Sequence, residues 1–214
     1  MNERPDLTTD ELLSTTRAVR KRLDLERAVP REVVEECLRL AFQAPNGSNR
    51  QLWQWVVVDD PDTRGAMADL YREAIGVYVH GLDVPPVDWA SPEGERMSAS
   101  VAHLTEHLHE VPVLVVPAVL GRAGASVVDQ SLVWNSIAPA TWSFMLALRS
   151  RGLGSVWTTV HLALEERMAD LLGIPYPAYT QAGLVPVAWT IGTDFRPGPR
   201  DDLTEVVHWN RWRG

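Results

Sequence analysis

A polar loop at residues 45–51 carries side chains and backbone groups that could hold a planar, polar ligand. The loop follows a predicted amphipathic helix at about residues 31–43. It precedes an apolar, β-branched run at residues 53–58, which predicts a buried strand. At such a junction the backbone N–H groups lie near the edge of the sheet, within reach of a ligand. An ordinary turn of common turn residues is the alternative. The residues in question are Pro45, Asn46, Ser48, Asn49 and Gln51.

Motifs that mark other catalytic chemistries are absent from the sequence, among them a Gly-x-Ser-x-Gly elbow, a Walker loop and a helix-opening Gly-x-Gly-x-x-Gly. His103 and His107 are four residues apart on a predicted helix, with His109 close by, but no acidic or cysteine partner follows at a useful spacing. We therefore expect no metal site. Without a carboxylate pair for acid–base work, an enzyme with this sequence would take its chemistry from a cofactor.

The charge distribution excludes some classes of partner. The formal net charge is −8, which argues against a general nucleic-acid or anionic-membrane binder. Basic residues nevertheless gather near both ends of the chain, which indicates either a local anion site or solvated helix faces. They are Arg17, Arg20, Lys21 and Arg22 near the start, and Arg196, Arg200, Arg211 and Arg213 near the end.

Length and composition predict one domain over residues 1–214. Cys37 is the single cysteine, so no intrachain disulfide can form; we expect a cytoplasmic protein in which Cys37 is a small packed side chain. The sequence shows no apolar signal core at its start and no apolar run of about 18 residues, so no membrane span is expected.

Hydrophobic periodicity predicts alternating helices and strands. A long excursion at about residues 81–97, rich in proline and glycine, interrupts the pattern and predicts either a lid or a plain surface loop. The expected helices lie at about 8–17, 31–43, 62–80, 97–109, 127–151 and 164–172. The expected strands lie at about 53–58, 111–120, 155–160 and 182–191.

The predicted helix at 127–151 is apolar on nearly all sides, so it must run through the core or pack against a partner. Pro139 lies inside it and predicts a kink or a helix in two parts. Gly152 follows as a left-handed cap.

Four segments, in order, resemble motifs of the FMN-dependent nitroreductase family. Thr16-Arg17-Ala18-Val19-Arg20 resembles its Arg-Arg-Ser-x-Arg, and residues 44–53 resemble its Ala-Pro-Ser-x-x-Asn-x-Gln-Pro-Trp. Gly152-Leu153-Gly154-Ser155-Val156-Trp157 resembles its Gly-Leu-Gly-x-x-Trp. Arg200 and residues 203–212 resemble its phosphate-side arginine and C-terminal extension. The resemblance covers residues 16–212.

The resemblance implies an α+β sandwich with a central, mostly antiparallel sheet flanked by helices. It also implies an intertwined homodimer with FMN at the interface. The implied activity is ping-pong hydride transfer from NADH or NADPH, through FMN, to a small aromatic or conjugated acceptor such as a nitroaromatic or a quinone. The family's other chemistries, which are dehydrogenation, dehalogenation and flavin breakdown, stay open.

The resemblance also implies roles for individual residues. The phosphate and the N1–O2 edge of the flavin would meet Arg17, Ala18, Arg20, Arg196 and Arg200. The flavin face or edge would meet Ser155, Trp157 and Thr158, and the neighbouring subunit would supply the loop residues Pro45, Asn46, Ser48, Asn49 and Gln51. The candidates for substrate contacts are Trp89, within the excursion, and Tyr78, shortly before it.

Several positions depart from the family pattern. Thr16 replaces an arginine, Ala18 and Asn46 each replace a serine, and Leu52 replaces a proline. Asp201-Asp202 stands where Arg-Pro is expected. These departures leave open a flavin-binding protein without turnover.

Overall fold

An antiparallel sheet forms the centre of the molecule, which is a computed structural model that describes residues 4–78, 88 and 90–212. Four strands follow the order β1-β6-β3-β2; β4 also pairs with β6, and β5 with β3. All these pairings are antiparallel. The strands are β1 (Leu23–Asp24), β2 (Trp53–Val58), β3 (Val113–Leu120), β4 (Leu153–Ser155), β5 (Tyr179–Gln181) and β6 (Val185–Thr190).

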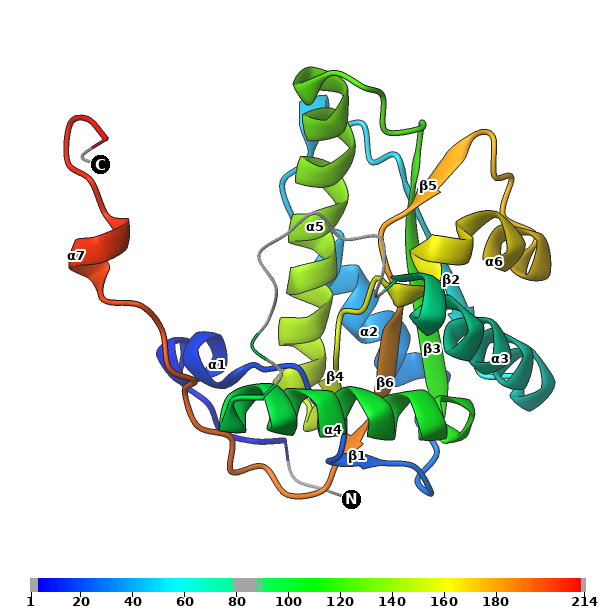
Figure 1. Cartoon of the computed structure of the whole chain (residues 1–214), viewed down its shortest axis with the longest axis horizontal. Coiled ribbons are helices and arrows are strands. Elements are labelled where there is room, and N and C mark those ends of the chain that lie inside the picture. Colours follow the sequence, from blue (N-terminus) through cyan, green and yellow to red (C-terminus); the bar gives the residue numbers. More distant parts are fainter. Residues whose placement is uncertain (1–3, 79–87, 89, 213–214) are drawn as a thin grey trace.

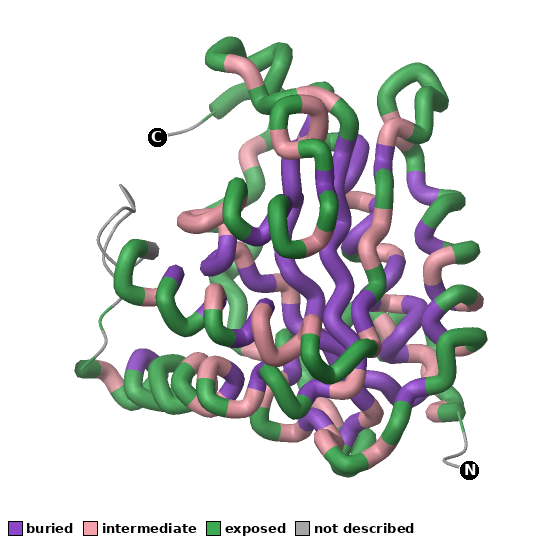
Figure 2. The backbone as a smooth tube through the Cα atoms, turned by 90° about the vertical axis from the view of Figure 1, so that its right-hand side faces the viewer, coloured by how far each residue is buried: buried purple, intermediate pink, exposed green. Residues whose placement is uncertain are grey.

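Helices cover both faces of this sheet, which explains why β3 is apolar throughout. Successive residues of a strand point to opposite faces. Accordingly, Leu114 and Val116 join the hydrophobic cluster under α3 (Pro61–Tyr78), whereas Val113 and Val115 join the cluster under α2 (Arg31–Ala41) and α5 (Val127–Arg149). Figure 2 shows these buried strands in the middle of the molecule, enclosed by exposed helix surfaces.

The remaining helices lie around the edge. Figure 1 shows α4 crossing one end of the molecule, α6 beside α3, and α7 standing apart from the sheet on the C-terminal tail. Their bounds are α1 (Thr9–Thr15), α4 (Pro92–His107), α6 (Glu165–Leu172) and α7 (Leu203–Val206), with 3-10 turns η1 (Gly47–Asn49), η2 (Leu108–Glu110) and η3 (Val160–Leu164). None of the helices within the described ranges is long and apolar enough to cross a membrane.

Most predicted elements are confirmed, with bounds shifted by a few residues. The predicted strand at 53–58 is β2, and the predicted strand at 111–120 is β3. Thr8 caps α1 in a capping box: its hydroxyl accepts from the Glu11 N–H at 3.2 Å, and the Glu11 carboxylate accepts from the Thr8 N–H at 2.8 Å. Cys37 is fully buried, and burial raises the pKa of its thiol to about 11, which confirms a packed side chain.

The predicted start of α4 at residue 97 is wrong. The helix begins at Pro92, inside the supposed excursion, and the hydroxyl of Ser91 caps it by accepting from the Gly94 N–H at 3.1 Å. Proline at the first helical position costs nothing, because the N–H that it lacks has no helical acceptor there. Pro92 therefore marks the start of a helix rather than a break.

Two predicted strands are also wrong in their bounds. The strand expected at 155–160 is β4 at Leu153–Ser155, because pairing with β6 starts directly after Gly152. Gly152 is left-handed as predicted, with a φ of 80°, but the C-cap of α5 is Ser150. The strand expected at 182–191 is β6 at Val185–Thr190, and β5 at Tyr179–Gln181 was not predicted. Gly183 lies between them, where the indole of Trp157 leaves no room for a side chain.

Of the two alternatives predicted at Pro139, the helix in two parts is wrong, because α5 runs unbroken from Val127 to Arg149, and the kink stays a prediction. Residues on both sides of the proline are buried: Ile137 and Ala140 are 0 % exposed. Packing of these residues holds the helix together where one backbone hydrogen bond is missing.

Replacing Gly183 by alanine tests the close approach to Trp157. The new methyl would lie 2.2 Å from the indole nitrogen and break the hydrogen bond from that nitrogen to the Ala182 carbonyl. We expect urea unfolding to show that the free energy of unfolding falls by about 1–3 kcal/mol. Gly65→Ala, in α3, is the control. No atom lies within 4 Å of the new methyl, so the free energy of unfolding should rise by about 0.5–1 kcal/mol. Equal effects would contradict the packing described.

The buried His161 predicts a pH dependence of stability. Its Nε2 lies 3.1 Å from the Gln181 side-chain oxygen, and desolvation lowers its pKa from 6.5 to about 4. The unfolded chain therefore binds a proton that the folded chain does not. Stability should fall as the pH drops from about 6.5 to 4, by on the order of 3 kcal/mol.

In urea unfolding at pH 7.5 and pH 4.5, His161→Gln should lose less stability between the two pH values than the wild type. Identical losses in the two proteins would show that His161 is not the group responsible.

Candidate functional site

Residues 16–20 are joined to the sheet through β4. The Val19 N–H donates to the Ser155 carbonyl at 2.9 Å, and Ala18 forms an isolated parallel bridge with Ser155. Arg20 is half-buried beside them, and desolvation lowers the pKa of its guanidinium. The structure therefore brings Arg17, Ala18 and Arg20 to Ser155, although these residues are more than 130 positions apart in the chain.

Arginines from the two ends of the chain meet around Gly198. Arg17 donates to the Arg196 carbonyl at 3.2 Å, and Arg200 donates to the Pro199 carbonyl at 2.7 Å. A methyl placed on Gly198 would lie 3.0 Å from a guanidinium nitrogen of Arg200 and 3.1 Å from one of Arg17. The structure thus collects the predicted Arg17, Arg196 and Arg200 in one place. In the described ranges, none of the three has an acidic partner.

The acidic residues at 201 and 202 do not occupy these arginines. Asp202 caps α7 by accepting from the backbone N–H of Thr204 at 2.8 Å and from its hydroxyl at 2.6 Å. The hydrogen bond from the Thr204 hydroxyl, and to a smaller extent the one from its backbone N–H, hold the pKa of Asp202 below its usual value. The carboxylate of Asp202 therefore serves the helix and leaves the guanidiniums available to an external anion.

In the segment after β4, several polar atoms of Trp157 and Thr158 already form hydrogen bonds within the protein. Trp157 donates its indole N–H to the Ala182 carbonyl at 2.9 Å. Thr158 donates its backbone N–H to Leu184 at 3.0 Å and shares a 2.8 Å hydroxyl hydrogen bond with Tyr71. Within the described residues, nothing accepts from the backbone N–H of Trp157. That N–H is a donor of this segment that could reach a ligand.

The loop at 45–51 holds an unusual backbone conformation. Ser48, Asn49 and Gln51 have φ angles of 54°, 52° and 50°, a left-handed region that costs non-glycine residues on the order of 1–3 kcal/mol each. Asn46 supports the loop by accepting from the Gln51 N–H at 3.0 Å. The loop encloses a hollow of about 60 Å³ against α5, lined in part by Leu132 and Ser136. Such strain is common in loops that form functional sites, and the sequence, which predicted a ligand site here, did not predict the strain.

The loop contacts the N-terminal half of α5, whereas the C-terminal end of α5 contacts the segment that carries Arg196. The Gly47 N–H donates to the Ser136 hydroxyl at 3.2 Å, whereas Arg149 donates to the Thr193 carbonyl, three residues before Arg196. A helix rises about 1.5 Å per residue, so these two points are about 20 Å apart along the axis.

Two predicted substrate contacts cannot be placed. Trp89 lies outside the described residues, as does the side chain of Tyr78, which ends α3. The role of the 81–97 excursion therefore stays a prediction apart from its last residues, which form the start of α4.

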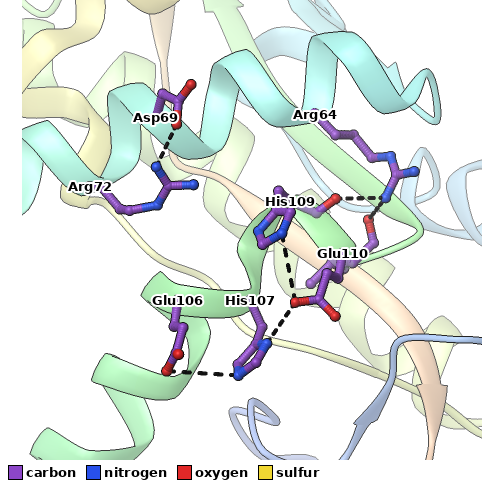
Figure 3. A network of polar contacts seen from close by, with 8 residues as sticks. Arg64, Asp69, Arg72, Glu106, His107, His109 and Glu110 are labelled. Atoms are coloured by element: carbon purple, nitrogen blue, oxygen red, sulfur yellow. Dashed lines mark hydrogen bonds and ion pairs between the residues drawn. The ribbon is translucent and has the colours of Figure 1, made fainter.

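Two histidines of the group, His107 and His109, contact the carboxylate of Glu110 (Figure 3). His107 Nδ1 lies 2.7 Å from Glu110 Oε1, and His109 Nε2 lies 3.7 Å from the same oxygen. The hydrogen bond with His107 is the main reason why the pKa of Glu110 lies below its usual value. Among the described residues no three His, Cys, Asp or Glu side chains are arranged to hold a metal ion.

Known proteins show the same sequence pattern. A family model described as the nitroreductase family matches residues 13–189. Iodotyrosine deiodinase 1 of Rattus norvegicus is 27% identical over 177 residues, which are 77% of this chain and 56% of that protein. The chain therefore spans about half the length of the deiodinases that it matches.

Solved structures share the fold. A structure of iodotyrosine deiodinase bound to FMN and 3-iodo-L-tyrosine matches with a TM-score of 0.72 at 21% identity, covering 95% of this chain and 99% of that one. The FMN and NADPH-dependent nitroreductase NfnB of sphigopyxis sp. strain HMH matches with a TM-score of 0.71 at 21% identity, covering 96% and 100%. The motif order, the α+β architecture and the family match agree: the chain belongs to the nitroreductase family.

Proposed function

We propose that this protein is an FMN-dependent oxidoreductase that works as a homodimer and reduces an electron-poor aromatic or conjugated compound with NADH or NADPH. The observation that carries the proposal is the meeting of Arg17 and Arg200 at Gly198. Two guanidiniums without acidic partners in the described residues are a charge arrangement that an anion would stabilise. A phosphate accepts charge-assisted hydrogen bonds from such a pair, and FMN carries one.

Other residues suit the ring of FMN. The backbone N–H of Trp157 would donate to the flavin edge, beside Ser155 at the end of β4. Arg20 is half-buried, so its positive charge acts in a medium of low dielectric constant. It would stabilise negative charge that develops on the ring. When bound, FMN would supply the redox chemistry, accepting hydride from the nicotinamide and passing it to the second substrate in a ping-pong cycle.

A second copy of the chain would complete the site. The residues of α5 that contact the strained loop and the arginine-bearing segment, Ser136 and Arg149, are about 20 Å apart along the helix axis, so a compact site that uses both would draw them from two chains. The N-terminal part of α5 also exposes Val127, Val128 and Leu132, at 80%, 68% and 59%. An apolar surface next to the loop is suited to a partner subunit.

The visible spectrum of the purified chain tests this proposal. We expect a flavin spectrum after addition of FMN, and NADPH or NADH should bleach it under anaerobic conditions. The bleached protein should then recover its colour on addition of a nitroaromatic or a quinone. A colourless protein that takes up no FMN would exclude the proposal, and bound flavin that neither nucleotide reduces would indicate a binding protein without turnover.

Reductive dehalogenation is a second candidate, supported by the likeness to iodotyrosine deiodinase. Adding 3-iodo-L-tyrosine to the bleached protein separates the two. Iodide release faster than nitroaromatic reduction would favour dehalogenation.

A further inference from the structure

The loop that delivers Arg196 and Arg200 has little backbone support of its own. Residues 192–202, between β6 and α7, belong to no helix or strand. Figure 1 shows this segment running from the end of β6 past α1 to α7. Its last sheet-like contact is the hydrogen bond from the Ile191 N–H to the Arg22 carbonyl at 2.9 Å. Side chains must therefore hold the loop in place if Gly198 is to sit between Arg17 and Arg200.

Two arginines that contact the ring of Phe195 supply that support. The guanidinium carbon of Arg22 lies 4.2 Å from the centre of the Phe195 ring, and that of Arg149 lies 4.8 Å from it. Both arginines also bind the loop directly. Arg22 donates to the Ile191 carbonyl at 2.8 Å and to Asp194 at 2.6 Å, and Arg149 donates to the Thr193 carbonyl at 3.1 Å.

Arg149 is unfavourable for stability in this position. It is 3% exposed, and its Nε and Nη1 have no hydrogen-bond partner among the described residues. Desolvation is the main cause that lowers the pKa of the Arg149 guanidinium, and the charge of Arg22 lowers it further. A buried and incompletely paired charge is usually less stable than an apolar side chain of the same size. The residue therefore has a cost for folding that its contacts with the loop must explain.

We infer that Arg149 is a positioning residue: together with Arg22 it clamps Phe195 and so holds Arg196 and Gly198 where Arg17 and Arg200 can share one anion. This inference rests on the proposed function for the identity of the anion, the phosphate of FMN. The clamp itself depends only on the contacts of the loop. A simple role in the core would instead make Arg149 necessary for stability and irrelevant to the loop.

Arg149→Met in the full chain separates these roles, because methionine has a similar length and no charge. Hydrogen exchange of the protein without FMN should become faster in residues 193–200. FMN should bind about tenfold more weakly, a difference of about 1.4 kcal/mol. The thermal midpoint should stay equal or rise, since an unpaired buried charge is removed.

The matched control is Arg151→Met, which removes the same charge just beyond the same end of α5. Arg151 contacts Glu36 at 3.4 Å and the Ala147 carbonyl at 3.1 Å. Its replacement should leave the exchange of residues 193–200 and the FMN affinity as in the wild type. Phe195→Leu keeps the apolar bulk but removes the ring, so it should act like Arg149→Met. It also decides the question if Arg149→Met does not fold.

Wild-type exchange at 193–200 in both Arg149→Met and Phe195→Leu would overturn the inference. A lower thermal midpoint in Arg149→Met with unchanged loop exchange would also overturn it, because that result describes a core residue. If the wild type binds no FMN, the proposed function fails, and faster exchange in the two variants would still support the clamp.

Discussion

The hydrogen bond from the Val19 N–H to the Ser155 carbonyl is the contact on which the arrangement of the site depends. It fixes residues 17–20 against β4, and the neighbouring pairing of β1 with β6 brings the C-terminal segment to the same place. The arginines of both ends of the chain then lie together, with Asp194 as the acid that pairs with one of them, Arg22. Repulsion among like charges follows, and an anion bound between Arg17 and Arg200 would relieve it.

Two features that cost stability lie at or beside the proposed site. The loop at 45–51 holds three non-glycine residues in left-handed conformations, and Arg149 is buried without partners for two of its nitrogens. Other elements follow ordinary rules: β3 alternates between two apolar clusters, and Thr8 and Ser91 cap their helices. Local strain that the rest of the fold supports is common at functional sites.

Periodicity was sufficient for the elements whose burial is recorded in their own residues, such as β2 and β3. It failed where a distant residue decides. The bounds of β5 and β6 depend on Trp157, which excludes a side chain at Gly183, and no pattern within residues 179–190 records that contact. Pro92 misled the prediction because the same residue type breaks a helix in its interior and starts one at its first position.

The candidate site shows the same division. Motif order predicted that Arg17, Ala18 and Ser155 belong to one site, and the structure places them together. Arg149 and Phe195 were missed because each looks like part of its surroundings: an arginine in the last turn of a helix is favoured by the helix dipole, and a phenylalanine in a loop has no motif. Their pairing appears only when α5 and the C-terminal loop meet in space.

The central claim is that one site draws its arginines and its strained loop from two chains. Co-expression of two defective chains tests it: one carries Arg17→Met and Arg200→Met, the other Asn46→Ala and Asn49→Ala. Each alone should bind FMN poorly. When the two chains pair at random, about half of the dimers are mixed, and each mixed dimer has one of its two sites built from intact halves. FMN binding should therefore return to about a quarter of the wild-type amount. No recovery in proven mixed dimers would contradict the account, because both halves would then belong to the same chain.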